Sequence, residues 1–393
     1  MIDVRPVVSS ADMKAFLYLP ERLYKDDPAW APPLIPEVKK HLSPKHNPFF
    51  DNGEAQLFVA WRGAQPVGRI SAQIDFEHNR RYTEKTGFFG FFESENDQQV
   101  ADAMLNKASE WLLARGMNKI RGPFSFNINH PAGLLVKGFE FPPYIEMVHS
   151  LPYYPSLVEN WGLHKVKDLF AWRYDSSIDP NEMVQQIADS VAAHPGLVVR
   201  EVRMDRFEED LRIIMSIFNE AWAQNWGFVP LSEKEVKKLA DEMKLVIDPR
   251  LAFIAEVDGE PAAISLTIPN INQPLRRARG LSTPLMYARL IWDLKVRRNV
   301  SSARLMILGI RRKFRGSVLG GLSVLLYCKT HWVGKSLGMK EAELGWTLED
   351  NPRINAGIEM MGGECYKIYR VYEKGIGADA AKTELSSLLN EPM

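Results

Sequence analysis

Two stretches of the chain alternate apolar and polar residues on either side of a glycine-containing turn. The first, LFVAWRGAQPVGRISAQI, covers residues 57–74, and the second, AFIAEVDGEPAAISLTI, covers residues 252–268. Alternation with a period of two is typical of strands, and a turn with glycine between two such runs indicates a β-hairpin. Both hairpins resume after a proline, Pro66 or Pro261. The sequence therefore predicts two similar hairpins, one in each half of the chain.

Two further pairs of segments repeat in the same order. A helix that ends in Gly-Met and leads into a strand is predicted over 108–124 and again over 329–346, with Gly116 and Gly338 at the position where a left-handed residue ends a helix. A glycine followed by an alternating aromatic strand is predicted over 160–174 and over 361–372.

Three matching pairs in one order predict two units of one α/β architecture with mixed sheets. We place an N-terminal unit over 1–178, a linker with its own amphipathic helix over 179–194, a C-terminal unit over 195–375 and a flexible tail over 376–393.

Length and composition fit this division. The chain has 393 residues, of which 46% are hydrophobic and 25% charged, and this excludes a largely disordered or collagen-like protein. Cys328 and Cys365 are the only cysteines, which excludes a disulfide scaffold and a cysteine zinc cluster and fits a reducing compartment. The start lacks the features of a signal peptide, and charges break every long apolar run. We therefore expect a cytoplasmic protein without a spanning helix, a bound metal or a covalent cofactor.

Basic residues concentrate in one segment although the formal net charge is zero. Residues 275–315 contain twelve Lys or Arg and one acid, Asp293. Within this segment, 285–298 sets Trp292 and other apolar residues among Arg289, Lys295, Arg297 and Arg298 at helical spacing, which predicts a short basic amphipathic helix. The helix either packs on its own domain with solvated arginines, or lies on anionic lipid or receives an amphiphilic substrate. Nucleic acid is not an expected partner, because no recognisable binding module accompanies the charge.

A second basic run joins the strand Arg304–Ile310 to a helix, with the sequence RRKFRGSVLGG over 311–321. A strand that leads through a glycine-bearing turn into a helix presents free backbone N–H groups and the positive end of the helix dipole, so an anion fits there. The alternative is a basic turn without a ligand. The residues expected to hold a phosphate-bearing cofactor are Ile310, Arg311, Arg312, Lys313, Arg315, Gly316, Ser317, Gly320 and Gly321.

The second unit resembles the GNAT superfamily of acyl-CoA-dependent N-acyltransferases. Its turn is similar to the family's pyrophosphate loop, with Arg315 in the first position and Gly320 in the last, while Val318 stands where a glycine is usual. The strand EAELGWTLEDN ends in Asn351, as the family's fifth strand ends in an asparagine, and a tyrosine-rich strand follows. The resemblance is good over 250–372 and weak over 55–175. It implies two tandem GNAT-like units, acyl-CoA as co-substrate and an amine acceptor.

The resemblance also implies catalytic candidates. The attacking amine must lose a proton, and Glu343 on the strand EAELGW lies next to the expected thioester, so it is the candidate base. Asn351 corresponds to the family's asparagine near the pantetheine arm, unless it only caps the helix that begins at Pro352. The family's acid, a tyrosine seven residues later, corresponds to Ile358 here. Tyr366 and Tyr369 on the last strand are therefore the substitutes, or else packing residues.

The first unit departs from the family pattern where CoA would bind. Its matching turn, GFFGFFESENDQQV, carries acidic residues that would repel a pyrophosphate, so we expect one CoA site, in the second unit. A nearby loop concentrates Asn127, Asn129 and His130, and Glu146 follows. These four residues either form turns or contribute to the acceptor site, to which Trp292 would also belong.

The whole chain resembles a bacterial group of tandem proteins that includes ceramide synthases, which N-acylate a sphingoid base. The segments that carry this resemblance are YLPERLYKDDPAWAPPL, KTGFFGFFE and the terminal YKIYRVYEK. This resemblance implies an N-acyltransferase with a long-chain amine as acceptor. The basic amphipathic segment 285–298 would suit such an acceptor, by peripheral contact of a cytoplasmic protein with the inner face of an anionic membrane. The alternative is a non-catalytic acyl-CoA- or lipid-binding protein, in which the departures at Val318 and Ile358 mark lost chemistry.

Overall fold

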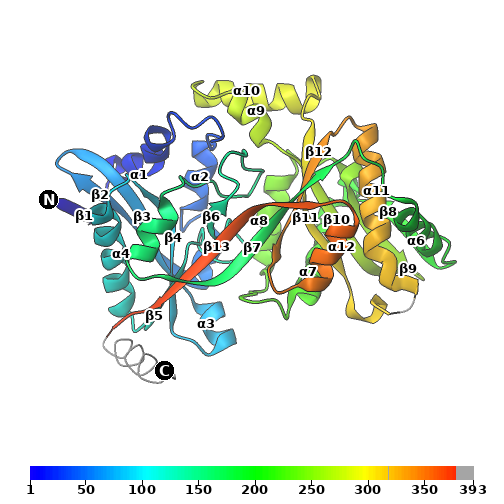
Figure 1. Ribbon diagram of the computed structural model, residues 1–393, viewed down its shortest axis with the longest axis horizontal. Coiled ribbons are helices and arrows are strands. Elements are labelled where there is room, and N and C mark those ends of the chain that lie inside the picture. Colours follow the sequence, from blue (N-terminus) through cyan, green and yellow to red (C-terminus); the bar gives the residue numbers. More distant parts are fainter. Residues whose placement is uncertain (317, 378–393) are drawn as a thin grey trace, which may run out of the picture. The chain divides into compact units, whose positions relative to one another are not determined.

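The computed structural model describes residues 1–316 and 318–377 (Figure 1). Ser317 and most of the tail predicted over 376–393 lie outside the described residues. Packing divides the chain into two units. Of the described residues, unit 1 holds Met1–Pro142, Glu146–Leu169 and 368–377, and unit 2 holds Pro143–Ile145 and Phe170–Lys367. The strands β7 (His164–Asp175) and β13 (Glu364–Gly375) thus each begin in one unit and end in the other.

Unit 1 is built on a sheet in the order β1-β2-β3-β4-β5-β13, with β6 also pairing with β13. Only its β4–β5 pair is parallel among the pairs of this sheet in the described residues. Its remaining strands are β1 (Ile2–Pro6), β2 (Gly53–Arg62), β3 (Gln65–Asp75), β4 (Thr86–Ser94), β5 (Lys119–Gly122) and β6 (Leu134–Lys137). Its helices are α1 (Ser10–Leu23), α2 (Ile35–His41), η1 (Pro48–Asp51), α3 (Phe76–Tyr82), α4 (Gln98–Leu113) and α5 (Tyr154–Asn160).

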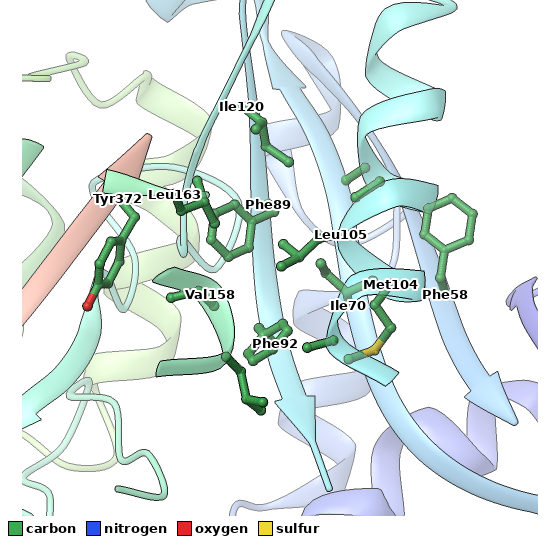
Figure 2. Packing of buried hydrophobic residues seen from close by; sticks show 14 of the residues in the cluster. Phe58, Ile70, Phe89, Phe92, Met104, Leu105, Ile120, Val158, Leu163 and Tyr372 are labelled. Carbon is green, nitrogen blue, oxygen red and sulfur yellow. The ribbon is translucent and has the colours of Figure 1, made fainter. Parts of the chain in front are cut away.

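The core of unit 1 forms where α4 packs on the sheet. Figure 2 shows Met104 and Leu105 of α4 beside Ile70 and Phe89 of the strands, and all four side chains are fully buried. The helix comes so close that a Cβ at Gly68 would lie 2.6 Å from the Met104 sulfur. Burying such side chains stabilises the unit by ~1.5–3 kcal/mol each.

Unit 2 is built on a sheet in the order β7-β12-β11-β10-β9-β8. Its strands are the second part of β7, then β8 (Leu197–Glu201), β9 (Ala252–Val257), β10 (Glu260–Pro269), β11 (Ser302–Ile310) and β12 (Glu341–Leu348). Its α-helices are α6 (Glu182–Ala192), α7 (Phe207–Trp222), α8 (Glu233–Met243), α9 (Asn272–Arg277), α10 (Thr283–Ile291), α11 (Leu322–Ser336) and α12 (Pro352–Met360). Its short turns are η2 (Met204–Arg206), η3 (Pro249–Leu251), the π-helical η4 (Trp292–Val296), η5 (Arg312–Phe314) and η6 (Val318–Gly321).

The repeat read from the sequence is confirmed element by element. The hairpins β2–β3 and β9–β10 are antiparallel pairs. Gly116 and Gly338 follow the two corresponding helices with φ of +79° and +81°, and Gly162 and Gly362, before β7 and β13, also have positive φ. Side chains with a Cβ disfavour this region, so these glycines end the helices where the pattern requires it.

The helix predicted in the linker exists as α6, and it packs within unit 2. Asn181 caps its N-terminus by accepting from the Val184 N–H. Val184 and Val191 on one face of α6 are buried in the cores of unit 2. The segment 179–194 is therefore structurally part of unit 2 rather than a free connection. Among the described residues, none of the helices has both the length and the apolar character needed to cross a bilayer.

Candidate active site

The parallel strands β11 and β12 pair only along their first halves. The ladder joins Ser302–Leu305 to Glu341–Leu344, whereas β11 continues to Ile310 along β10 and β12 continues to Leu348. Arg304 and Glu343 are direct partners in this register. The ladder between the two strands therefore ends directly after the residue that the sequence suggests as the base.

Glu343 is fully buried, so it is not a solvated strand carboxylate. The Tyr366 hydroxyl donates to its Oε2 at 2.6 Å, which brings together two of the predicted catalytic residues. The other oxygen, Oε1, has no hydrogen-bond partner among the described residues. Burial raises the pKa of Glu343, while Arg304, Lys367 and the Tyr366 hydrogen bond oppose that rise. The result is a carboxyl with one oriented oxygen and one oxygen able to accept a proton.

Arg304 forms an ion pair with this carboxyl. Its Nε lies 3.4 Å from Glu343 Oε1, and its two terminal nitrogens donate to Ile145 O at 2.8 Å and to Gly345 O at 2.9 Å. In the sequence, Arg304 is one of the basic residues of 275–315 and has no predicted role of its own. A signal was present, since Arg304 interrupts an otherwise apolar strand, SARLMILGI.

Lys367 is the second buried cation near Glu343. It is fully buried, and its Nζ lies 5.6 Å from the centre of the Tyr366 ring. Its positive charge helps to lower the pKa of Glu343. Burying one carboxylate with two cations is the arrangement expected for a carboxyl that is to stay ionised away from water.

The other two catalytic candidates lie elsewhere. The Asn351 side chain caps α12 by accepting from the Ile354 N–H at 3.4 Å, which is the capping alternative left open by the sequence. Tyr369 belongs to unit 1, where it is fully buried next to Gly133. Ile358, in the place of the family's tyrosine, is buried in the core of unit 2.

The basic turn that follows β11 is partly neutralised by the protein's own acids. Arg311 pairs with Glu220 at 2.6 Å and donates to the Ser216 hydroxyl at 3.0 Å. Lys313 pairs with Glu260, and Arg315 Nε donates to Ile310 O at 2.9 Å. These contacts fix the shape of the turn, and the side chains of Arg312 and Arg315 are exposed.

The turn leads into α11, whose N-terminus is suited to an anion. The N-cap residue is Gly321, the first turn of α11 contains no acid, and no side chain caps the helix in the described part of the chain. A Cβ at Gly321 would lie 2.7 Å from Val191 of α6, so a larger residue would force α6 away. Uncapped N–H groups beside exposed arginines are what a pyrophosphate needs.

The corresponding helix of unit 1 begins differently. The Asp97 side chain caps α4 by accepting from the Gln99 N–H, and Arg62 bridges Asp97 and Glu95. Arg22 also pairs with Glu95, at 2.7 Å. These carboxylates satisfy and shield the helix start, which disfavours a second anion there.

The predicted acceptor residues of the first half all lie in unit 1. Asn127 is buried, accepts from the Asn129 N–H at 3.1 Å and donates to Asp75 at 3.3 Å. The His130 ring centre lies 4.7 Å from that of His41. Glu146 is exposed with a φ of +58°. Their local hydrogen bonds agree with a turn-forming role.

The basic segment forms an excursion between β10 and β11, made of α9, α10 and η4 (Figure 1, yellow). Its single acid, Asp293, is fully buried and pairs with Arg289 at 2.9 Å and with Arg277 at 3.6 Å. Arg289 thus pairs with a buried acid while 36% of its side chain stays exposed. The large apolar residues that the excursion exposes are Leu281, Leu285, Ile291, Trp292 and Val296.

Comparisons with known proteins were made for the whole chain. No family model matches it. It is 40% identical over 378 residues to the bacterial ceramide synthase of Caulobacter vibrioides (strain NA1000 / CB15N), which covers 95% of this chain and 98% of that protein. It is 39% identical over 377 residues to the protein YghO of Escherichia coli (strain K12), which covers 95% of each.

Solved structures show the same fold at low sequence identity. A tandem GNAT protein from the clavulanic acid biosynthesis pathway matches with a TM-score of 0.59 at 15% identity, over 96% of this chain and 99% of that one. A GCN5-related N-acetyltransferase from Sphaerobacter thermophilus matches with a TM-score of 0.53 at 15% identity, over 96% of each chain. The expected mixed α/β fold with tandem GNAT-like units is confirmed. The chain belongs to the family of the bacterial ceramide synthase, a family of N-acyltransferases, and it has the tandem GNAT fold.

Proposed function

We propose that this protein transfers an acyl group from acyl-CoA to a primary amine, and that the amine carries a long alkyl chain, as a sphingoid base does. The observation that carries the reaction is the buried Glu343, with one oxygen hydrogen-bonded by Tyr366 and the other held, in the described structure, only by the ion pair with Arg304 at 3.4 Å. The long-chain acceptor is supported by the name of the Caulobacter relative and by the exposed apolar excursion.

Glu343 acts as the general base in this proposal. The nitrogen lone pair attacks the thioester carbonyl carbon, the carbonyl π electrons move to oxygen, and Glu343 Oε1 takes a proton from nitrogen. When the tetrahedral intermediate collapses, the C–S bond breaks and sulfur leaves with the electron pair. Tyr366 gives its proton to that sulfur and regains one from the Glu343 carboxyl. The products are an amide and free CoA, and both residues return to their starting forms.

The cations beside Glu343 make this cycle possible at neutral pH. Burial alone would leave the carboxyl protonated, because a buried charge is poorly solvated. Arg304 and Lys367 offset part of that effect and keep the pKa from rising further. The base must be ionised when the amine arrives, and the two cations favour that form, while the raised pKa makes the carboxylate a better proton acceptor.

Acyl-CoA binds, in this proposal, at the turn between β11 and α11. Its pyrophosphate meets the N–H groups around Gly320 and Gly321 and the exposed Arg312 and Arg315, while Gly316 leaves room for close approach. Arg311 and Lys313, which are paired with acids, hold the turn in shape instead. Ile310 ends β11 and sets where the turn begins.

Charge reversal at Arg312 and Arg315 together is expected to weaken CoA binding by a few kcal/mol, since each charge-assisted hydrogen bond contributes ~1.5–3 kcal/mol. Isothermal titration calorimetry with CoA measures the effect. The matched control reverses Lys234 and Lys237, two exposed lysines on α8 of the same unit, and it should bind CoA as the wild type does. Unchanged affinity in the Arg312/Arg315 variant would place CoA elsewhere.

The acceptor reaches the site from a bilayer in this proposal, through peripheral contact of the excursion with an anionic membrane. Leu285, Trp292 and Val296 offer an exposed apolar surface, and Lys295, Arg297 and Arg298 are exposed beside it. Apolar residues insert at the interface while each basic residue adds ~1 kcal/mol of attraction to anionic lipid. Asp293 pairs with Arg289 and Arg277, so the charges proposed to meet the lipid are the other three.

Purified protein is expected to release free CoA when long-chain amines in anionic vesicles are supplied with acyl-CoA, and a thiol reagent measures the release. A variant with Lys295, Arg297 and Arg298 replaced by glutamine should lose vesicle binding and activity on the vesicle-borne amine. It should keep activity on a short soluble amine. CoA binding without release with any amine would favour the non-catalytic alternative, and wild-type protein that ignores anionic vesicles at low salt would refute the membrane contact.

A further inference from the structure

Three residues from the first half of the chain pack in unit 2. The segment Pro143–Ile145 has unit 1 residues on both sides in the sequence. Pro143 O accepts from the Asn272 side chain at 3.0 Å, and Ile145 O accepts from Arg304 at 2.8 Å. The Ile145 side chain is buried in a core of unit 2. The segment is therefore fixed at both ends, and one end is held by the arginine that pairs with Glu343.

Tyr144, in the middle of this segment, is 93% buried, with a relative exposure of 7%. Its hydroxyl makes no well-aligned hydrogen bond among the residues that the structure describes, although Ser302 and Glu341, the first register pair of β11 and β12, are its polar neighbours. Burial raises the pKa of Tyr144 well above its ordinary value, and the carboxylates of Glu341 and Glu343 raise it further. The phenol therefore keeps its proton, and it remains a donor.

Three buried polar atoms of unit 2 lack a well-aligned hydrogen bond in the described chain: Glu343 Oε1, Arg304 Nε and the Tyr144 hydroxyl. The first two face each other as an ion pair at 3.4 Å. Buried polar groups nearly always have partners, so a group of three calls for an explanation. One of them can accept a proton and two can donate a hydrogen bond. The tetrahedral intermediate of aminolysis offers the complementary groups, an N–H that must lose its proton and an oxyanion that needs donors.

We propose that the Tyr144 hydroxyl donates a hydrogen bond to the thioester oxygen as negative charge develops on it. This inference rests on the proposed acyl transfer at Glu343. Tyr144 keeps its proton throughout: the π electrons move onto the carbonyl oxygen during attack and return to the carbon when the C–S bond breaks. Arg304, tied to two backbone carbonyls, then serves to position Glu343 and the segment that carries Tyr144.

The test is Tyr144→Phe, assayed by free CoA release. Removing one oxyanion donor lowers kcat by ~10²–10³-fold in enzymes that use this device, and we expect a loss of that order with KM changed little. Thermal stability should be unchanged or raised, because the variant removes a buried hydroxyl that makes no well-aligned hydrogen bond in the described structure. A purely structural tyrosine would give the opposite result, lower stability with kcat retained.

Tyr174→Phe is the matched control. Tyr174 is buried to the same extent in the same unit, and its hydroxyl bonds His331 Nδ1 at 2.7 Å. This variant should lose stability and keep kcat. If Tyr144→Phe does not fold, fluorotyrosines of graded acidity incorporated at position 144 preserve packing and should alter kcat in step with their acidity.

The outcomes separate this inference from the proposed function. Wild-type kcat in Tyr144→Phe, or in all fluorotyrosine forms, overturns the role of Tyr144. If Glu343→Gln is slow in the same assay while Tyr144→Phe is not, only the inference fails. If both variants keep the wild-type rate, the chemistry does not occur at Glu343 and the proposed function fails with it.

Discussion

Replacing Glu343 with glutamine is expected to lower kcat for CoA release by about 10²–10⁴-fold, the usual contribution of a general base. Glutamine has nearly the same shape and can still accept from Tyr366, which donates to Oε2 in the wild type. It cannot take a proton from the amine at the other position. Because the change acts in the transition state, kcat and kcat/KM should fall together while KM for acyl-CoA stays near its wild-type value.

Two measurements distinguish a lost base from a damaged site. CoA affinity by calorimetry should be unchanged, because the phosphate turn lies away from Glu343 along β11. Glu359→Gln, which changes an exposed carboxylate on α12 of the same unit, should keep the wild-type rate. Near-normal turnover in Glu343→Gln would mean that catalysis relies on positioning alone, with the amine losing its proton to bulk water.

The pH dependence of the wild type follows from the same carboxyl. Catalysis requires the ionised form, and burial raises the pKa of Glu343 above the ordinary 4.5. The rate kcat/KM should therefore rise with pH through a midpoint above 4.5 and level off once the carboxyl is ionised. Glu343→Gln should lack this rise in a profile measured on the same substrates.

The sequence predicted those features that depend on local pattern. Gly116 and Gly338 were expected at left-handed helix ends, and both have positive φ because the chain reverses there. Glu343 and Tyr366 were each named as catalytic candidates from the strand order of the second unit, and the structure brings the two side chains into contact. In each case the deciding information lay within a few residues, or in a strand order shared with known folds.

Other features depend on contacts that no local pattern contains. Arg311 was expected to face a ligand, yet it pairs with Glu220, which lies far away in the sequence on α7. Arg289 was expected to face solvent or anionic lipid, yet it pairs with the buried Asp293. The sequence shows charge but not burial, so it could not distinguish a surface arginine from one that satisfies an internal acid.

Arg304 and Tyr144 show the same limit at the site itself. Arg304 was one of twelve basic residues in its segment, and only the β11–β12 register reveals that it faces Glu343. Tyr144 lies within the first half of the sequence, and no periodicity indicates that Pro143–Ile145 joins the second unit. Both residues enter the site through long-range packing.

Arg304→Met is expected to destabilise unit 2 by about 3–5 kcal/mol at neutral pH, the usual cost of leaving one partner of a buried ion pair behind. The substitution removes one of the cations beside Glu343, and it also removes the group that donates hydrogen bonds to Ile145 O and Gly345 O. Urea denaturation and hydrogen exchange of the β11 and β12 amides measure it. Arg173→Met is the control, since Arg173 is half exposed in its pair with Glu341 and should cost only ~0–1 kcal/mol.

The cost of Arg304→Met should depend on pH in a definite direction. The folded-state pKa of Glu343 is raised above its unfolded value by burial, and removing Arg304 takes away a group that lowers it. The contribution of such a carboxyl to stability is fully present below the pKa that it has in the unfolded chain. The contribution is lost as the pH rises through the pKa that it has in the folded protein. The variant should therefore be closest to wild type in acid and fall further behind as pH increases. An equal deficit at every pH would show that Arg304 acts through packing and its two carbonyl contacts instead.

The double variant Arg304→Met/Glu343→Leu separates the charge from the space that the side chains fill. Replacing both members of a buried pair by apolar residues is often neutral or stabilising, so the double variant should recover much of the stability that Arg304→Met loses. It should remain inactive, because no base is left beside the thioester. Recovery of stability without activity would mean that this ion pair is retained for chemistry rather than for folding. A double variant as unstable as Arg304→Met would instead assign Arg304 chiefly to holding Ile145 and Gly345 in place.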